Sequence, residues 1–190
     1  MRLLAFCFVL MITFSLSAQG KYEREYRISD TEVPSAATAF VDALDFQKKV
    51  KWYLEESLVG ETIEAKSRKN GRYYSIEFDK SGNLQDVEIK VAVNALPDDF
   101  RVNMFQYFDS AFDRVFKIGK IQEQFSGDTD AILRYLTEGT TSDKVIKKYE
   151  VVFNARKGEA NEMFECTFAA DGTFESQKTI ILSDTDNLEF

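Results

Sequence analysis

The same strand-and-turn pattern occurs twice in this chain. Residues 73–83 read YYSIEFDKSGN, and residues 163–173 read MFECTFAADGT. In each copy a phenylalanine ends an alternating run and a glycine follows four positions later, at Phe78 and Gly82 and again at Phe168 and Gly172. Alternation of this kind is typical of a strand with one buried face, and the glycine is typical of a turn with positive φ. The pattern therefore predicts one structural unit that is present twice.

Each copy is predicted to begin with a helix. The two prolines of the chain, Pro34 and Pro97, each precede apolar residues at helical spacing, and proline favours the first turn of a helix. We expect helices over 34–47 and from residue 97 onward. Four alternating segments follow each helix, which predicts an α+β fold: a tandem repeat of a helix packed on a four-stranded antiparallel meander sheet.

The domain boundaries follow from this repeat. We expect a first unit over 21–94 and a second, diverged unit over 95–190 that carries an insertion at 126–143. The insertion contains a predicted short helix over 129–137, and Asp128 is its expected cap.

The first residues have the layout of a secretory signal peptide. Residues 1–20 contain one basic residue, Arg2, followed by an apolar run and then by small residues. The apolar run is shorter than the ~20 residues of a membrane span. We therefore expect a periplasmic or secreted protein with no membrane span after cleavage. Residues 21–29, KYEREYRIS, alternate polar and apolar side chains; we interpret them as a charged lead-in, with a leading strand as the alternative.

The charge of the chain limits its partners. Acidic residues number 32 against 24 basic residues, which gives a formal net charge of −8. An acidic surface argues against nucleic acid and anionic lipid as partners. The expected partner is another extracytoplasmic protein.

The residue types that most acid–base and zinc chemistry requires are missing. The chain has no histidine, the commonest general base and zinc ligand. Cys166 lies among phenylalanines, and we interpret it as a small buried apolar residue. Asp128, Asp130 and the stretch 183–190 have spacings that calcium could use, but we interpret them as a helix start and a solvated tail. We expect a protein that is not an enzyme, with no metal site and no cofactor.

The first unit resembles the PepSY-like family of Gram-negative secreted proteins, which is also described as β-lactamase-inhibitor-like. The matching features are Val33-Pro34, Phe40, Val50-Lys51-Trp52, and the segment 74–79 before Gly82. The resemblance implies tandem helix-plus-four-strand units, similar in architecture to the β-lactamase inhibitory protein, whose concave polar sheet surface binds a target enzyme. It implies no particular binding residue, because the matched residues belong to the core and the turns.

The leading interpretation is a non-catalytic binding or inhibitor-like protein that acts through a polar sheet surface. The alternative is a carrier that holds a small apolar ligand between helix and sheet, which a cavity of about 300 Å³ or more would favour. Tyrosines among charged residues favour an interface, because tyrosine supplies contact area at small entropic cost. The candidate binding residues, on a face expected to lie open to water, are Tyr53, Glu55, Glu64, Lys66, Tyr73 and Glu77.

The apolar sides of the same strands predict the core. Trp52 and Phe78 are expected to anchor the core of the first unit, and Phe168 that of the second.

We predict cleavage of the exported chain between Ala18 and Lys21, because small residues follow the apolar run there. Mass spectrometry of the mature protein should find an N-terminus within this interval. An intact Met1 in the exported protein would contradict the prediction.

Overall fold

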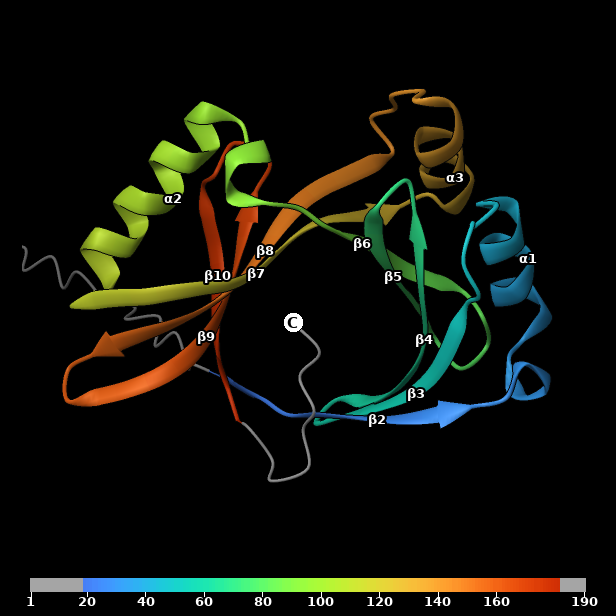
Figure 1. Cartoon of the computed structure of the whole chain (residues 1–190), viewed down its shortest axis with the longest axis horizontal. Coiled ribbons are helices and arrows are strands. Elements are labelled where there is room, and N and C mark those ends of the chain that lie inside the picture. The colour runs from blue at the N-terminus through green and yellow to red at the C-terminus, as the bar shows by residue number, and fades with distance from the viewer. Residues whose placement is uncertain (1–18, 182–190) are drawn as a thin grey trace, which may run out of the picture.

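A computed structural model describes residues 19–181, in which ten strands form one sheet (Figure 1). The strands are β1 (Gln19–Lys21), β2 (Glu23–Ile28), β3 (Lys51–Ser57), β4 (Gly60–Lys69), β5 (Arg72–Phe78), β6 (Leu84–Lys90), β7 (Arg114–Gly127), β8 (Val145–Lys157), β9 (Ala160–Ala169) and β10 (Phe174–Ile180). The helices are α1 (Ser35–Ala43), α2 (Asp98–Ala111) and α3 (Thr129–Glu138), with short 3₁₀ turns η1 (Asp30–Glu32) and η2 (Val93–Ala95).

The first strands close the sheet into a nearly complete ring. The strand order is β1-β10-β9-β8-β7-β6-β5-β4-β3-β2, so β1 and β2 occupy its two ends. Only Tyr22 separates β1 from β2. β1 pairs in parallel with β10, and β2 pairs antiparallel with β3. One extended segment therefore joins both ends of the sheet, and the interpretation of residues 21–29 as a charged lead-in is wrong.

The predicted α+β architecture is also wrong. The chain does not form two helix-covered meander sheets, because β6 pairs antiparallel with β7 and makes the sheet continuous. The structure is mostly sheet, with 51% strand and 24% helix, in a nearly closed, barrel-like arrangement. Helix α2 separates β6 from β7 along the chain, so the two strands are not joined by a hairpin turn that would predict their pairing.

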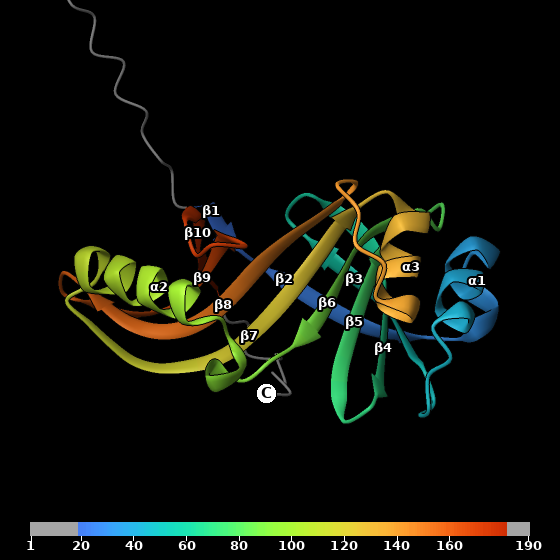
Figure 2. The ribbon, with the colours of Figure 1, turned by 90° about the horizontal axis from the view of Figure 1, so that it is seen from above.

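The helices lie on the outer side of the curled sheet, with α1 and α3 side by side and α2 at the other end (Figures 1 and 2). Pro34 and Pro97 are the cap residues that immediately precede α1 and α2, as the sequence predicts. Helix α1 ends before residue 47 because Asp45 adopts a φ of 51°. Asp128 caps α3, and its carboxylate accepts a hydrogen bond from the backbone N–H of Ala131.

Two apolar cores pack between the helices and the sheet. Trp52 and Phe78 are buried in the first core, and Phe168 is buried in the second, which confirms the predicted anchors. Cys166 is buried in the second core, as expected. The predicted insertion contributes to the first core through Ile132 of α3, which is fully buried there. The second half of the chain thus completes the core of the first.

The repeated glycines fit each turn against a helix start. Gly82 and Gly172 both have a φ of 86°, a left-handed conformation that glycine adopts without strain. A Cβ on Gly82 would lie 2.8 Å from Cβ of Pro34, and a Cβ on Gly172 would lie 2.8 Å from the backbone oxygen of Phe100. The repeat noticed in the sequence is therefore a turn that contacts the first residues of its helix.

The proposed signal peptide lies almost entirely outside the described residues, and the division into units at residue 94 stays a prediction. Between residues 19 and 181, no helix combines the length and apolar character that a membrane crossing requires.

Replacing Phe78 or Phe168 with alanine should lower the free energy of unfolding by about 3–5 kcal/mol, because each leaves a cavity in a packed core. Urea denaturation of the mature protein measures this loss. Leu58→Ala is the control: Leu58 is 68% exposed, and its loss should change stability by less than about 0.5 kcal/mol. Equal, small effects at all three positions would show that the core is placed wrongly.

Candidate functional site

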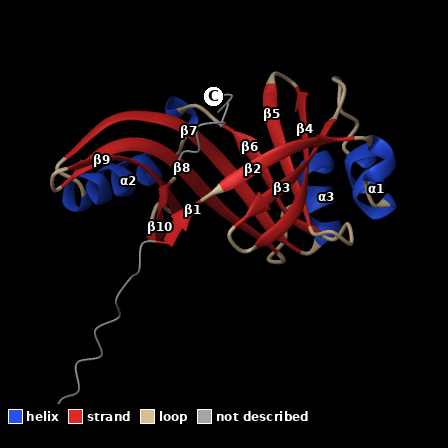
Figure 3. Ribbon diagram, turned by 90° about the horizontal axis from the view of Figure 1, so that it is seen from below, coloured by secondary structure: helices blue, strands red, loops and turns tan. Residues whose placement is uncertain are grey.

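The sheet curls into a ring (Figure 3), and the strand register gathers acidic residues on the face that points into it. The strand register places carboxylates opposite one another on this face, for example Glu25 opposite Glu55 and Glu64 opposite Glu77. The carboxylates of this inner acidic face are Glu23, Glu25, Glu55, Glu64, Glu77, Asp86, Glu88, Glu150 and Glu165.

Lys21 of β1 links both ends of the sheet through ion pairs on this face. Its Nζ lies 2.6 Å from Oε2 of Glu165 on β9 and 3.0 Å from Oε1 of Glu23 on β2. Oε1 of Glu150 on β8 lies 3.8 Å away. Burial alone would lower the pKa of Lys21, but these carboxylates outweigh it and raise the pKa well above its ordinary value. Lys21 therefore stays charged.

The pKa values of several carboxyl groups on this face are raised. Burial, together with the charges of Glu23, Glu64 and Glu77, raises the pKa of Glu55 to about 9. Burial and neighbouring carboxylates raise the pKa of Asp86 to about 8. Burial is also the main cause of the raised pKa values of Glu88, Glu150 and Glu165.

The six predicted binding residues all lie on the polar face, but that face is not open to water. Glu55 and Glu64 are only 8% and 7% exposed, so the expected water-facing sheet is wrong for its centre. The reason is that the sheet closes into a ring through β2, which pairs with β3, so this face points into the ring. The binding role of the six residues stays a prediction.

The structure brings four of these residues together, places Glu77 beside them opposite Glu64, and leaves Tyr73 apart. Tyr53, Glu64 and Lys66 cluster around Glu55: Lys66 Nζ lies 3.0 Å from Glu64 Oε2 and 5.1 Å from the centre of the Tyr53 ring. Glu77 accepts a hydrogen bond from Thr62 on the neighbouring strand. Tyr73 lies at the start of β5, away from this cluster. Its side chain is 48% exposed, and the guanidinium of Arg68 lies 3.5 Å from its ring centre.

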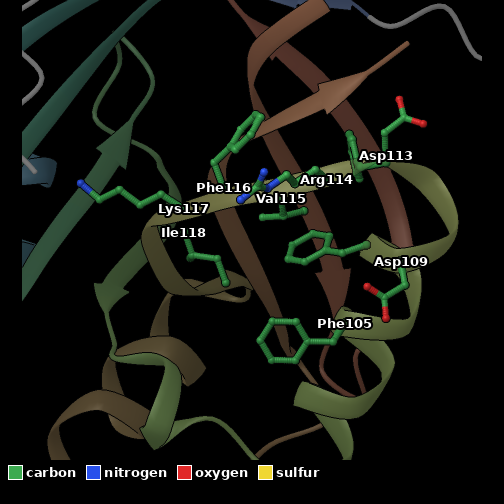
Figure 4. Close-up of a pocket in the computed structure, with 10 residues that line it drawn as sticks. Phe105, Asp109, Asp113, Arg114, Val115, Phe116, Lys117 and Ile118 are labelled. Atoms are coloured by element: carbon green, nitrogen blue, oxygen red, sulfur yellow. The ribbon is translucent and has the colours of Figure 1, made fainter. Parts of the chain in front are cut away.

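A groove lies outside the ring, between α2 and the first half of β7 (Figure 4). It has a volume of about 540 Å³, and its apolar walls include Phe105, Val115 and Ile118. A second groove of about 580 Å³ continues along α2 and shares Phe105 with the first. Phe105 is 43% exposed and Phe116, at the rim, is 48% exposed.

The strand beside this groove has an unpaired edge. β6 pairs only with residues 122–126 of β7, and the last bond on that side joins the N–H of Val91 to the carbonyl of Ile121. Along residues 114–120, no other strand of the described chain pairs with that side of β7. Register shifts against β8 occur at Phe116 and Gly119 in this same segment.

Sequence reasoning missed Lys21, Glu25 and the groove. The signal for the first two was the alternation of Lys21, Glu23 and Glu25, which marks a strand with charges on one face. Phe105 directly follows the buried Met104 on α2, and the structure leaves it exposed.

Comparison with known proteins identifies likenesses of fold only. No family model matches the chain, and no curated protein matches it. Among solved structures, a DUF2874 family protein from Bacteroides ovatus superimposes with a TM-score of 0.51 at 8% identity, over 77% of this chain and 87% of that chain. A BLIP-like protein from Bacteroides fragilis gives a TM-score of 0.48 at 18% identity, over 80% and 91%. A protein described as periplasmic, from Bacteroides eggerthii, gives 0.49 at 10% identity, over 77% and 88%.

The likeness to the DUF2874 protein shows a shared fold. The expected PepSY-like resemblance finds no support among the family models, because none matches the chain. Identity this low says nothing about activity or partners.

Stability should fall as pH rises, because carboxyls such as Glu55 and Asp86 have higher pKa values in the folded chain than in the unfolded chain. Such groups take up protons on folding, so their stabilising effect is complete below about pH 4 and is lost as pH approaches 8–9. We expect the unfolding free energy to be larger at pH 5.5 than at pH 8.5 by more than about 1.4 kcal/mol, the equivalent of one pKa unit. Urea denaturation at the two pH values tests this.

Glu55→Gln supplies the internal check for this pH dependence. The variant should be more stable than the wild type at pH 8.5 and should show a shallower dependence on pH, because it removes one buried ionisable group. Stability that rises between pH 5.5 and 8.5 in the wild type would contradict the assignment.

Proposed function

We propose that this chain is a non-catalytic binding protein of the extracytoplasmic space that docks an extended segment of a partner protein along the free edge of β7. The observation that supports this proposal is the unpaired run of residues 114–120 beside an aromatic groove. Backbone N–H and C=O groups on an open strand edge can form a ladder with an added strand.

The groove supplies side-chain contacts for such a strand. Side chains of an extended segment alternate between its two faces, so every second one would point toward α2. Phe105, Val115 and Ile118 line the space that such a side chain would enter. An aromatic residue in a groove beside the paired backbone is the usual source of specificity in this mode of recognition.

Charges on the strand side favour an acidic segment. Arg114 and Lys117 are both exposed, and neither forms an ion pair with another residue of the described chain. Of the acidic groups at this site, Asp109 belongs to α2, and Asp113, which immediately precedes β7, already accepts a hydrogen bond from the backbone N–H of Gly158. An acidic residue of the partner would therefore be expected next to the strand rather than next to the helix.

The groove rather than the inner acidic face is the proposed protein-binding surface. Glu55 and Glu64 are covered by the closed sheet, where a folded partner cannot reach them. Tyr73, which is 48% exposed, stays a candidate contact at the end of the polar face.

The groove also gives a specific reason to keep the carrier as the second candidate. Its volume of about 540 Å³ is within the usual range for small-molecule sites. A carrier function predicts that a free apolar ligand binds there with no requirement for strand pairing. Displacement of an apolar fluorescent dye by a fatty acid, but not by peptides, would favour this alternative.

The peptide proposal is tested by selection from a display library of random 12-residue peptides on the mature protein. We expect selected peptides to alternate apolar residues, to carry acidic residues, and to slow amide hydrogen exchange in residues 114–120. Phe105→Ala should weaken binding by at least about tenfold, because aromatic anchors carry most of the affinity in such interfaces. Lys117→Glu should weaken the binding of acidic peptides.

Leu58→Ala is the matched control, since it removes an exposed apolar side chain from the hairpin between β3 and β4. It should leave binding unchanged. Selected peptides that bind Phe105→Ala as tightly as the wild type, or that leave exchange in residues 114–120 unaltered, would overturn the proposal.

A further inference from the structure

Three carboxylates on neighbouring strands converge within the inner acidic face. Glu25 on β2, Glu55 on β3 and Glu64 on β4 each contribute one oxygen, and these oxygens all lie within 4.8 Å of one another. The closing strand creates the cluster, because β2 places Glu25 directly opposite Glu55. The neighbouring β4 brings in Glu64, opposite Tyr53.

Glu55 lacks a partner although it is buried. It is 8% exposed, and it forms no hydrogen bond or ion pair with any side chain of residues 19–181. Its neighbours differ: Glu25 pairs with Lys66 at 2.7 Å, and Glu64 accepts a hydrogen bond from Ser75 and lies 3.0 Å from Lys66 Nζ. A buried carboxylate without a partner costs free energy unless a cation or a proton compensates it.

We propose that Glu25, Glu55 and Glu64 form a binding site for one calcium ion. Calcium takes six to eight oxygen ligands at about 2.3–2.6 Å, so two ligand oxygens on one ion are at most about 5 Å apart. The measured spread of 4.8 Å meets this limit without any change in the backbone. Carboxylates that bind through both oxygens supply up to six ligands, whereas magnesium prefers fewer carboxylates and retained water.

Lys66 occupies the place of the cation when calcium is absent. Its ammonium lies 2.7 Å from Glu25 and 3.0 Å from Glu64, and neither of these ion pairs involves Glu55. The Tyr53 ring centre lies 5.1 Å from Lys66 Nζ and gives the displaced ammonium an alternative contact. Removal of Lys66 should therefore tighten the binding of calcium.

The charged groups that face Glu55 from the neighbouring strands are Lys21, Glu23, Glu25, Glu64, Lys66 and Glu77.

The inference is independent of the proposed peptide groove, and its test uses the mature protein with terbium and calcium. Terbium binds to calcium sites, and a nearby excited tyrosine sensitises its luminescence. Tyr53 can serve as this tyrosine because it lies opposite Glu64 in the cross-strand register. We expect sensitised luminescence that calcium displaces, with one ion per chain by calorimetry. Glu55→Gln should weaken calcium binding by at least about tenfold, and Lys66→Met should strengthen it by a similar factor.

The controls separate a specific site from the general acidity of the chain. Glu61 lies on β4, the strand that also carries Glu64, and it pairs with Lys80 outside the cluster. Glu61→Gln should therefore leave the affinity for calcium unchanged. Glu64→Gln serves as the second variant should Glu55→Gln fail to fold by circular dichroism. Equal affinity in wild type, Glu55→Gln and Glu64→Gln, or no binding at millimolar calcium at pH 8.5, would overturn the proposal.

Discussion

The backbone ladder that β1 and β2 form with opposite ends of the sheet is the constraint on which the rest of this structure depends. Without it, the eight strands from β3 to β10 would form an open sheet with two free ends. With it, the ends meet through one segment, and Lys21 adds ion pairs to β2, β8 and β9 at the junction. Closure protects strand edges that would otherwise be open to pairing.

Closure also decides the chemistry of the two faces. The apolar face can only point outward, where α1, α2 and α3 cover it, and the polar face must point inward. Carboxylates that would be unremarkable on an open sheet are thereby desolvated, and their pKa values rise. The edge of β7 at residues 114–120 stays unpaired because β6 reaches only residues 122–126, which leaves the aromatic groove as the accessible surface.

Local features of this fold could be predicted from the sequence, and the non-local pairings could not. Period-two alternation located the strands and their faces, and it identified Trp52 and Phe78 as core residues. The turn glycines Gly82 and Gly172 could be identified because each follows such an alternating run at the same spacing. Pairing between β6 and β7, and between β1 and β10, joins strands with no hairpin between them, so no local pattern specifies it. Glu25 and Glu55 lie opposite each other only through such a pairing, so no local sequence pattern indicates that their side chains are close.

The parallel pairing of Gln19–Lys21 with β10 has a consequence for folding in time. The segment that leaves the ribosome early has a partner, Phe174–Ile180, near the opposite end of the chain. Contacts between such distant residues form late, because a long loop must close before they contribute. During synthesis, the first strand therefore has no partner in the sheet until almost the whole chain has been made, and shielding by a chaperone in that interval would limit wrong pairing.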